Sequence, residues 1–203
     1  MAIISLIEKR GSVYRLYADG RLLTAVDRAS FERAPLAEGD EVEEEKYLEA
    51  LARAQQKPAY EAALTALDRS AKTEKALRRW LSQRGYLEDA VEAAITRLRL
   101  ARLIDDGAIA ERLTEAGASG GMSKIAIKRK LRSKGVGEEE IESALEAVSD
   151  EGQLSSAKHL AQKLYPRYAR EERHAARAKL SQALARRGFS WDVIAQALEG
   201  FFE

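Results

Sequence analysis

The stretch Leu131–Leu145, which reads LRSKGVGEEEIESAL, decides the fold of this chain. Gly135 suits a left-handed backbone position, so it predicts the end of one helix. Three glutamates follow it, where a new helix exposes its free N–H groups and the positive end of its dipole. Ile141, Leu145 and Val148 then recur at spacings of four and three, which places them on one helical face. The stretch therefore predicts two helices that are joined at a glycine.

The same pattern occurs twice more, around Gly85 and around Gly188. In each copy a leucine lies four residues before the glycine and another apolar residue lies eight before it. An apolar residue follows the glycine directly, and further branched apolar residues stand six and ten positions beyond it. The glycines are 50 residues apart (85 to 135) and 53 residues apart (135 to 188). Because so many positions match in three places, the sequence predicts a tandem helical repeat.

Composition limits the class of protein. The 203 residues carry a net charge of +1, which by itself indicates neither a nucleic-acid nor a membrane partner. There is no cysteine, which excludes disulfides, thiol nucleophiles and thiolate metal sites. No apolar run approaches the length of a membrane span, and charged residues follow the first few apolar ones too soon for a signal peptide. We expect a soluble, cytoplasmic protein without a membrane partner.

The N-terminal residues have a different period. Short β-prone runs predict strands near 2–9, 12–18 and 21–26, and Asp19-Gly20 is a strong hairpin signal. A meander this small needs a surface to pack on, and we expect the following helices to supply it. One helical turn is expected near 29–34, followed by a loop.

The rest of the chain is predicted to be helical. We expect the first long helix to end before Pro58, a flexible break at Ala118–Gly121, and Pro166 to end or interrupt a helix. Ser123 and Ser190 are expected to cap helices. The predicted helices are near 43–55, 59–69, 73–84, 87–101, 105–116, 123–134, 138–149, 155–165, 171–187 and 191–202.

The predicted fold is mainly α, with tandem three-helix repeats in an elongated array and a small N-terminal β-hairpin or meander. The expected divisions are residues 1–57 for the β region with a linking helix, 58–104 for repeat one, 105–153 for repeat two and 154–203 for repeat three.

Four motifs, in this order and at this spacing, resemble the RecX family of bacterial regulatory proteins. They are Leu36-x2-Gly39-Asp40, Leu77-x3-Leu81-x3-Gly85-Tyr86, Leu103-Ile-Asp105-Asp106-x2-Ile109-Ala110, and Gly121-x3-Ile125-x5-Leu131-x2-Lys134-Gly135-Val136-x4-Ile141-x3-Leu145. The resemblance covers essentially the whole chain.

This resemblance implies a regulator that binds RecA filaments on DNA and depresses RecA's ATP hydrolysis, its strand exchange and the repressor self-cleavage that it promotes. That role belongs to DNA repair, homologous recombination and the SOS response.

Two alternatives to this function stay open. One is a non-specific DNA-binding module that competes for single- or double-stranded DNA, and the other is a helical scaffold for another protein. The sequence shows no heptad seam, so we expect a monomer.

One basic stretch covers residues 123–134, which hold no acid. Lys128 and Arg132 lie four residues apart, and like charges stacked in this way cost an isolated helix roughly a few tenths of a kcal/mol. An anionic partner would explain them, whereas the plain alternative is an ordinary solvated face. The expected buried contacts of this helix are Ile125, Ile127 and Leu131.

A second basic region runs from Lys158 to Arg187 and carries nine bases against two acids. Tyr165 and Tyr168 lie within it, either as a stacking or interface surface or as packing between repeats two and three. The candidate filament- or DNA-binding residues of both regions are Lys124, Lys128, Arg129, Lys130, Arg132, Lys134, Arg167, Arg170, Arg173, Arg177, Lys179, Arg186 and Arg187. Two separated anchors are predicted among them: Lys128, Arg129 and Arg132 in repeat two, and Arg173, Arg177 and Arg187 in repeat three.

Other conspicuous residues are better explained by architecture. Trp80 and Trp191 are expected to pack in cores or junctions. Tyr86 and Phe189 occupy the same repeat position, directly after the glycine that ends a helix in each repeat (the stop glycine). The last helix of each repeat opens with acids, which argues against its reading DNA as a recognition helix.

Signals for catalysis are weak. His159 and His174 lie on different predicted helices without an obvious carboxylate, and the pair Asp105-Asp106 is expected to cap a helix. No phosphate-binding loop or nucleophile elbow is evident. We expect no enzyme activity, no cofactor and no metal site.

Overall fold

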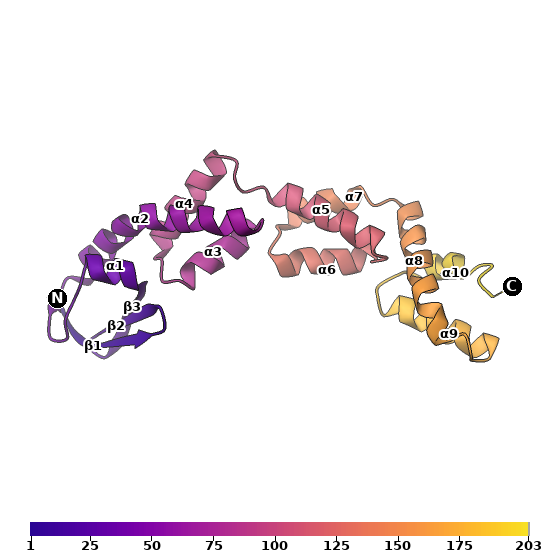
Figure 1. The fold of residues 1–203 in the computed structure, drawn as a ribbon, viewed down its shortest axis with the longest axis horizontal. Coiled ribbons are helices and arrows are strands. Elements are labelled where there is room, and N and C mark those ends of the chain that lie inside the picture. The colour runs from indigo at the N-terminus through magenta and orange to yellow at the C-terminus, as the bar shows by residue number, and fades with distance from the viewer. Residues whose placement is uncertain (203) are drawn as a thin grey trace. The chain divides into compact units, whose positions relative to one another are not determined.

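The N-terminal strands form an antiparallel sheet in the computed structural model, which describes residues 1–202 (Figure 1). The three predicted strands are present as β1 (Ala2–Arg10), β2 (Val13–Ala18) and β3 (Arg21–Asp27). Asp19 and Gly20 both have positive φ, at 47° and 78°, as a tight hairpin between twisted strands requires. The predicted meander is confirmed.

A short fourth strand, β4 (Glu41–Val42), was not predicted by the sequence. It pairs with β1, so the order in the sheet is β3-β2-β1-β4. The Ile4 amide donates to the Asp40 carbonyl at 2.9 Å, and the Gly39 amide donates to the Ile4 carbonyl at 2.8 Å. Two residues carry no period of their own, so this strand is defined by its partner rather than by its sequence.

Helix α1 (Arg28–Arg33) follows β3, and helix α2 (Glu44–Arg69) follows β4. Leu51 of α2 packs with Leu16 and Val26 of the sheet in one buried cluster. The expectation that the following helices cover the meander is therefore confirmed.

The predicted helix end before Pro58 is wrong, because α2 runs through Pro58 without a break. An internal proline removes a hydrogen bond and costs about 3 kcal/mol in an isolated helix. Here the buried stripe continues on both sides of it, with Leu51 and Gln55 before it and Ala59 and Ala63 after it. Packing of this stripe against the sheet at one end and repeat one at the other offsets the local cost.

Repeat one combines the second half of α2 with α3 (Glu74–Ser82) and α4 (Glu88–Leu100). Its core contains the apolar positions that define the repeat, which are Leu77, Leu81, Val91 and Ile95. All four side chains are fully buried.

Repeats two and three have the same helical order. Repeat two consists of α5 (Asp106–Ser119), α6 (Lys124–Lys134) and α7 (Glu138–Glu146). Repeat three consists of α8 (Asp150–Leu164), the short 3-10 helix η1 (Tyr165–Arg167), α9 (Arg173–Ala185) and α10 (Trp191–Ala197). The mainly α fold of tandem three-helix repeats is thus confirmed, and α8 ends just before Pro166 as predicted.

The predicted helix signals act as expected at several ends. Gly135 closes α6 with a φ of 83° in the left-handed region. The Ser123 hydroxyl accepts from the Ala126 amide at 3.1 Å, and the Ser190 hydroxyl accepts from the Val193 amide at 3.5 Å. Both serines therefore cap helices.

The break between helices that was expected at Ala118–Gly121 begins two residues later than predicted and covers residues 120–123. Helix α5 extends to Ser119, and the Ser156 hydroxyl on α8 donates to the Ala118 carbonyl at 2.8 Å. A Cβ at Gly121 would lie 3.1 Å from the Ser156 carbonyl oxygen, so the backbones of the two repeats meet closely here. Gly121 has a φ of +76°, so the left-handed backbone and the close contact both favour glycine at this position.

The chain divides into two compact units, of which the first ends at Asp105 and the second begins at Asp106. Within the first unit, repeat one joins the sheet through Gly85, whose φ is +84°. The buried Gln55 side chain donates to the Gly85 carbonyl at 2.8 Å and accepts from the Leu87 amide at 2.7 Å. The finer division into four parts stays a prediction.

Candidate interaction surface

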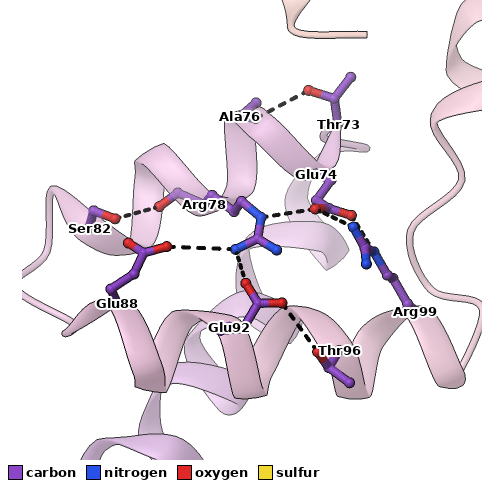
Figure 2. Close-up of polar contacts among 9 residues, drawn as sticks. All are labelled: Thr73, Glu74, Ala76, Arg78, Ser82, Glu88, Glu92, Thr96 and Arg99. Carbon is purple, nitrogen blue, oxygen red and sulfur yellow. Dashed lines mark hydrogen bonds and ion pairs between the residues drawn. The ribbon is translucent and has the colours of Figure 1, made fainter. Parts of the chain in front are cut away.

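A ladder of ion pairs joins the last two helices of repeat one (Figure 2). The Arg78 guanidinium contacts Glu92 at 2.6 Å and Glu88 at 3.8 Å on α4, and Glu74 at 2.9 Å on its own helix. Arg99 of α4 reaches back to the Glu74 carboxylate at 2.5 Å. Each charge in this ladder has an opposite neighbour, and the ladder links α3 to α4.

The same contacts shift the protonation equilibria of the ladder. The hydrogen bond to Glu92 raises the pKa of Arg78, and the hydrogen bond from Arg78 lowers the pKa of Glu92. Burial opposes ionisation of Glu74, but the hydrogen bonds from Arg99 and Arg78 outweigh it and lower the pKa of that carboxyl group. All of these groups are therefore charged at neutral pH.

Repeat two carries an equivalent ladder between α6 and α7. Lys128 stands seven residues before the stop glycine, as Arg78 does, and it contacts Glu138 and Glu142 at the two matching acidic positions. Arg132 adds a bidentate contact to Glu138, with nitrogen–oxygen distances of 2.9 and 2.7 Å. The geometry is the paired fork that guanidinium and carboxylate favour.

This ladder gives Lys128 and Arg132 an acidic partner within the repeat, and their binding to a filament or to DNA stays a prediction. Glu138, at the start of α7, neutralises both of them across the turn. The hydrogen bonds from Arg132 and Lys128 lower the pKa of the Glu138 carboxyl group to about 2. An acid at the start of the next helix therefore compensates the charge of both bases.

The repeat-two ladder predicts a dependence of stability on pH. Because the pKa of Glu138 is lowered from 4.5 to about 2, its stabilising effect is present above pH 4.5 and is lost as the pH falls towards 2. Glu138→Gln is expected to lower the urea midpoint of the second unit at neutral pH, and the difference from the parent should shrink on acidification. Trp191 fluorescence in a Trp80→Phe background would report the unfolding of this unit.

The matched control is Glu139→Gln, which removes the same charge one residue away from an exposed side chain without an ion pair in residues 1–202. Equal effects of the two substitutions at every pH would contradict the assigned role of Glu138.

Repeat three lacks the ladder. The equivalent of Arg78 and Lys128 is Ser181, and the equivalents of the two acids are Trp191 and Ala195. The Trp191 side chain is 65% exposed, so the prediction that it packs in a core or junction is wrong. A comparison of the third position after each stop glycine would have singled out this tryptophan from the sequence alone.

The other aromatic predictions have different outcomes. Trp80 packs against the core of repeat one, with the Arg84 guanidinium 3.5 Å from its ring centre, as expected of a structural residue. Phe189 is buried and Tyr86 is partly buried, which confirms their place in the cores.

Tyr165 and Tyr168 pack against the core of repeat three itself, and Tyr165 meets Phe201 edge-on at 5.2 Å. This arrangement favours packing within the repeat over a free stacking surface.

The prediction that Ile125 is buried is also wrong. Its side chain is 59% exposed, whereas Ile127 and Leu131 are buried as predicted. Ile125 lies where α6 meets repeat three, because a Cβ at Gly188 would fall 3.0 Å from the Ile125 Cβ. At the same joint the Ser123 hydroxyl donates to the Arg187 carbonyl at 2.5 Å.

The structure separates the candidate cations into engaged and unengaged ones. Lys128, Arg132 and Lys179 are engaged, the last by Glu171 at 2.8 Å. Lys134 is exposed at the end of α6. Within residues 1–202, the candidates that are at least partly exposed and have no ion pair are Lys124, Arg129, Lys130, Arg167, Arg170, Arg173, Arg177, Arg186 and Arg187.

The residues considered for catalysis are scattered. His159 lies on α8 and His174 on α9, and both side chains are exposed. Over the described part of the chain, no three His, Asp or Glu side chains are grouped so that they would hold a metal ion. Among the same residues, none of the helices combines the length and apolar character that crossing a membrane requires.

Comparison with known proteins agrees with the repeat structure. Three family models match in order: the first three-helix domain of RecX over residues 59–98, the second over 105–145 and the third over 151–198. Each match spans one of the helical repeats described above.

Similar proteins are known from several bacteria. The regulatory protein RecX of Limosilactobacillus reuteri (strain DSM 20016) is 34% identical over 95% of this chain and 74% of its own length. That of Levilactobacillus brevis is 31% identical over 98% of this chain and 76% of its own length.

Solved structures show the same likeness. A crystal structure of regulatory protein RecX superimposes with a TM-score of 0.68 at 32% identity and covers 98% of this chain and 100% of its own. RecX from Lactobacillus salivarius gives a TM-score of 0.66 at 28% identity over 73% of this chain and 97% of its own. Sequence, repeat order and fold all agree, and this chain therefore belongs to the RecX family of regulatory proteins.

Proposed function

We propose that this protein binds RecA filaments assembled on DNA and lowers their ATP hydrolysis, strand exchange and promotion of repressor self-cleavage. Its membership of the RecX family over nearly the whole chain is the observation that carries the proposal. The action belongs in the cytoplasm, where it would restrain homologous recombination and the SOS response during DNA repair.

The binding surface that we propose consists of the unengaged cations in the second unit. Arg129 and Lys130 of α6 supply one group, and Arg173, Arg177 and Arg187 in repeat three supply the other. Lys128 and Arg132 have a smaller part in this proposal than in the sequence-based one, because Glu138 already compensates their charge.

Because the two cationic groups lie on one folded unit, they are expected to bind the filament with a higher combined affinity than either group alone. Once the first group is engaged, the second meets its partner at a high effective concentration, so loss of either weakens both. Contacts of this kind are screened by salt. We therefore expect binding to the filament to weaken steeply as the ionic strength rises.

The decisive test is a titration of the protein into RecA ATPase, with single-stranded DNA already saturated by filament. The ATPase rate is expected to fall at protein concentrations well below that of RecA, since a bound regulator acts on a filament of many subunits. An unchanged rate even at excess protein would contradict the proposal.

A second function is favoured by the unengaged arginines, which would suit non-specific DNA binding in competition with RecA. A competitor must bind bare DNA at the concentration at which it inhibits. Binding to bare single- and double-stranded DNA, measured beside the ATPase rate, therefore separates this function from the first. Failure in both assays would leave a scaffold for another protein.

A further inference from the structure

Trp191 occupies the repeat position that carries an ion-paired glutamate in the other two repeats. Glu88 and Glu138 stand three residues after their stop glycines and contact Arg78 and Lys128 respectively. In repeat three an indole replaces the acid. The acid–base contact of repeats one and two is thus missing from repeat three, and an exposed tryptophan takes the place of the acid. This difference suggests that the Trp191 face of repeat three has a different role.

The other three positions of the repeat-two ladder hold small, uncharged residues in repeat three. Ser181 replaces the cation of the ladder, Ala195 replaces its second acid, and Ala185 stands where repeat two carries Arg132. The Ala195 side chain is exposed, whereas those of Ser181 and Ala185 are partly exposed. The Trp191 side chain is 65% exposed, and small residues hold the positions equivalent to the two bases that contact Glu138 in repeat two, which leaves room for a flat group against the indole.

Two arginines continue the same side of α9. Arg173 and Arg177 precede Ser181 at intervals of four residues, so all three point to one side of the helix. Both arginines are exposed, and neither has an ion pair within residues 1–202. Glu172 before α9 and Asp192 beside Trp191 are the acids next to this face in the sequence.

From this face we propose that Trp191 stacks on a base of single-stranded nucleic acid while Arg173 and Arg177 hold neighbouring phosphates. Aromatic side chains beside cations are the common means of binding single strands without sequence preference. A duplex does not fit, because its bases are stacked on one another and hidden from an indole. The inference rests on the proposed function and names the part of the filament's DNA that this repeat contacts.

Fluorescence tests the proposal directly, because the chain has two tryptophans and Trp80→Phe leaves Trp191 alone. Oligo-thymidine added at low salt is expected to quench the emission of this variant in a saturable way. Trp191→Ala should weaken oligonucleotide binding roughly tenfold, as expected for the loss of one stacked base. Trp191→Phe should retain most of the affinity, and a duplex of equal length should not quench.

The matched control is Leu100→Ala in the first unit, which shortens another exposed apolar side chain, 82% exposed, and should leave binding unchanged. Unaltered Trp191 emission while the oligonucleotide binds would overturn the proposal. So would a Trp191→Ala variant that binds the oligonucleotide like its parent but no longer inhibits RecA, since Trp191 would then contact protein. Quenching without any effect of the parent on RecA ATPase would instead sink the proposed function and leave the stacking intact.

Discussion

Replacement of Gly85 by alanine is expected to lower the free energy of unfolding of the first unit by about 3 kcal/mol, roughly a hundredfold in the folding equilibrium. Gly85 has a φ of +84°, which strains any residue that carries a Cβ. The added Cβ would also lie 2.6 Å from the Asp27 amide nitrogen and 2.7 Å from the Val26 carbonyl carbon. Both neighbours are backbone atoms of β3, which cannot move aside as a flexible side chain would.

The displacement would also reach Gln55. This buried amide bonds to the Gly85 carbonyl and the Leu87 amide, and the pair holds repeat one to the sheet. A shift of the turn leaves those groups poorly paired, and unsatisfied buried polar groups are costly. The effect is therefore cooperative across the joint rather than confined to one residue.

Urea denaturation measures the effect. In a Trp191→Phe background, Trp80 fluorescence reports the first unit alone. The control is Gly20→Ala, which has a similar φ of +78° but nothing within 4 Å of the added Cβ. It should lose only about 1 kcal/mol from backbone strain. Equal losses at the two positions would show that contact with β3 is unimportant.

The second large effect concerns binding. Substituting glutamine for Arg173, Arg177 and Arg187 together is expected to weaken binding to RecA–DNA filaments about a hundredfold, at roughly 1 kcal/mol for each charge-assisted contact. All three side chains are exposed and without ion pairs in the described residues, so the substitutions free no buried acid. The fold should persist, and the loss should appear in affinity rather than in stability.

Affinity should be measured at several salt concentrations, because removal of three phosphate contacts lowers the slope of log affinity against log salt by about two. The matched control removes three cations from the first unit with Arg28→Gln, Arg53→Gln and Lys57→Gln. Each of these is exposed and pairs with an acid four residues along its own helix. A comparable loss of affinity in the control would mean that net charge, and not the repeat-three face, governs binding.

The sequence by itself determined the features that are local or periodic. The stop glycines, the serine caps and the hairpin at Asp19-Gly20 each depend on the backbone of a few adjacent residues. The apolar positions recur in three copies, and this recurrence predicted the helical repeats. Such signals survive in sequence because they need no information about distant residues.

Other features depend on contacts between helices and strands, and these contacts can override a local sequence signal or supply a partner that the local sequence lacks. Helix α2 passes through Pro58 because packing on both sides of the proline outweighs the local penalty. The turn at Gly135 brings Glu138 against Lys128 and Arg132, although the basic stretch 123–134 itself holds no acid. In each instance the deciding contact joins residues on different helices or strands, so it forms only when those elements pack together.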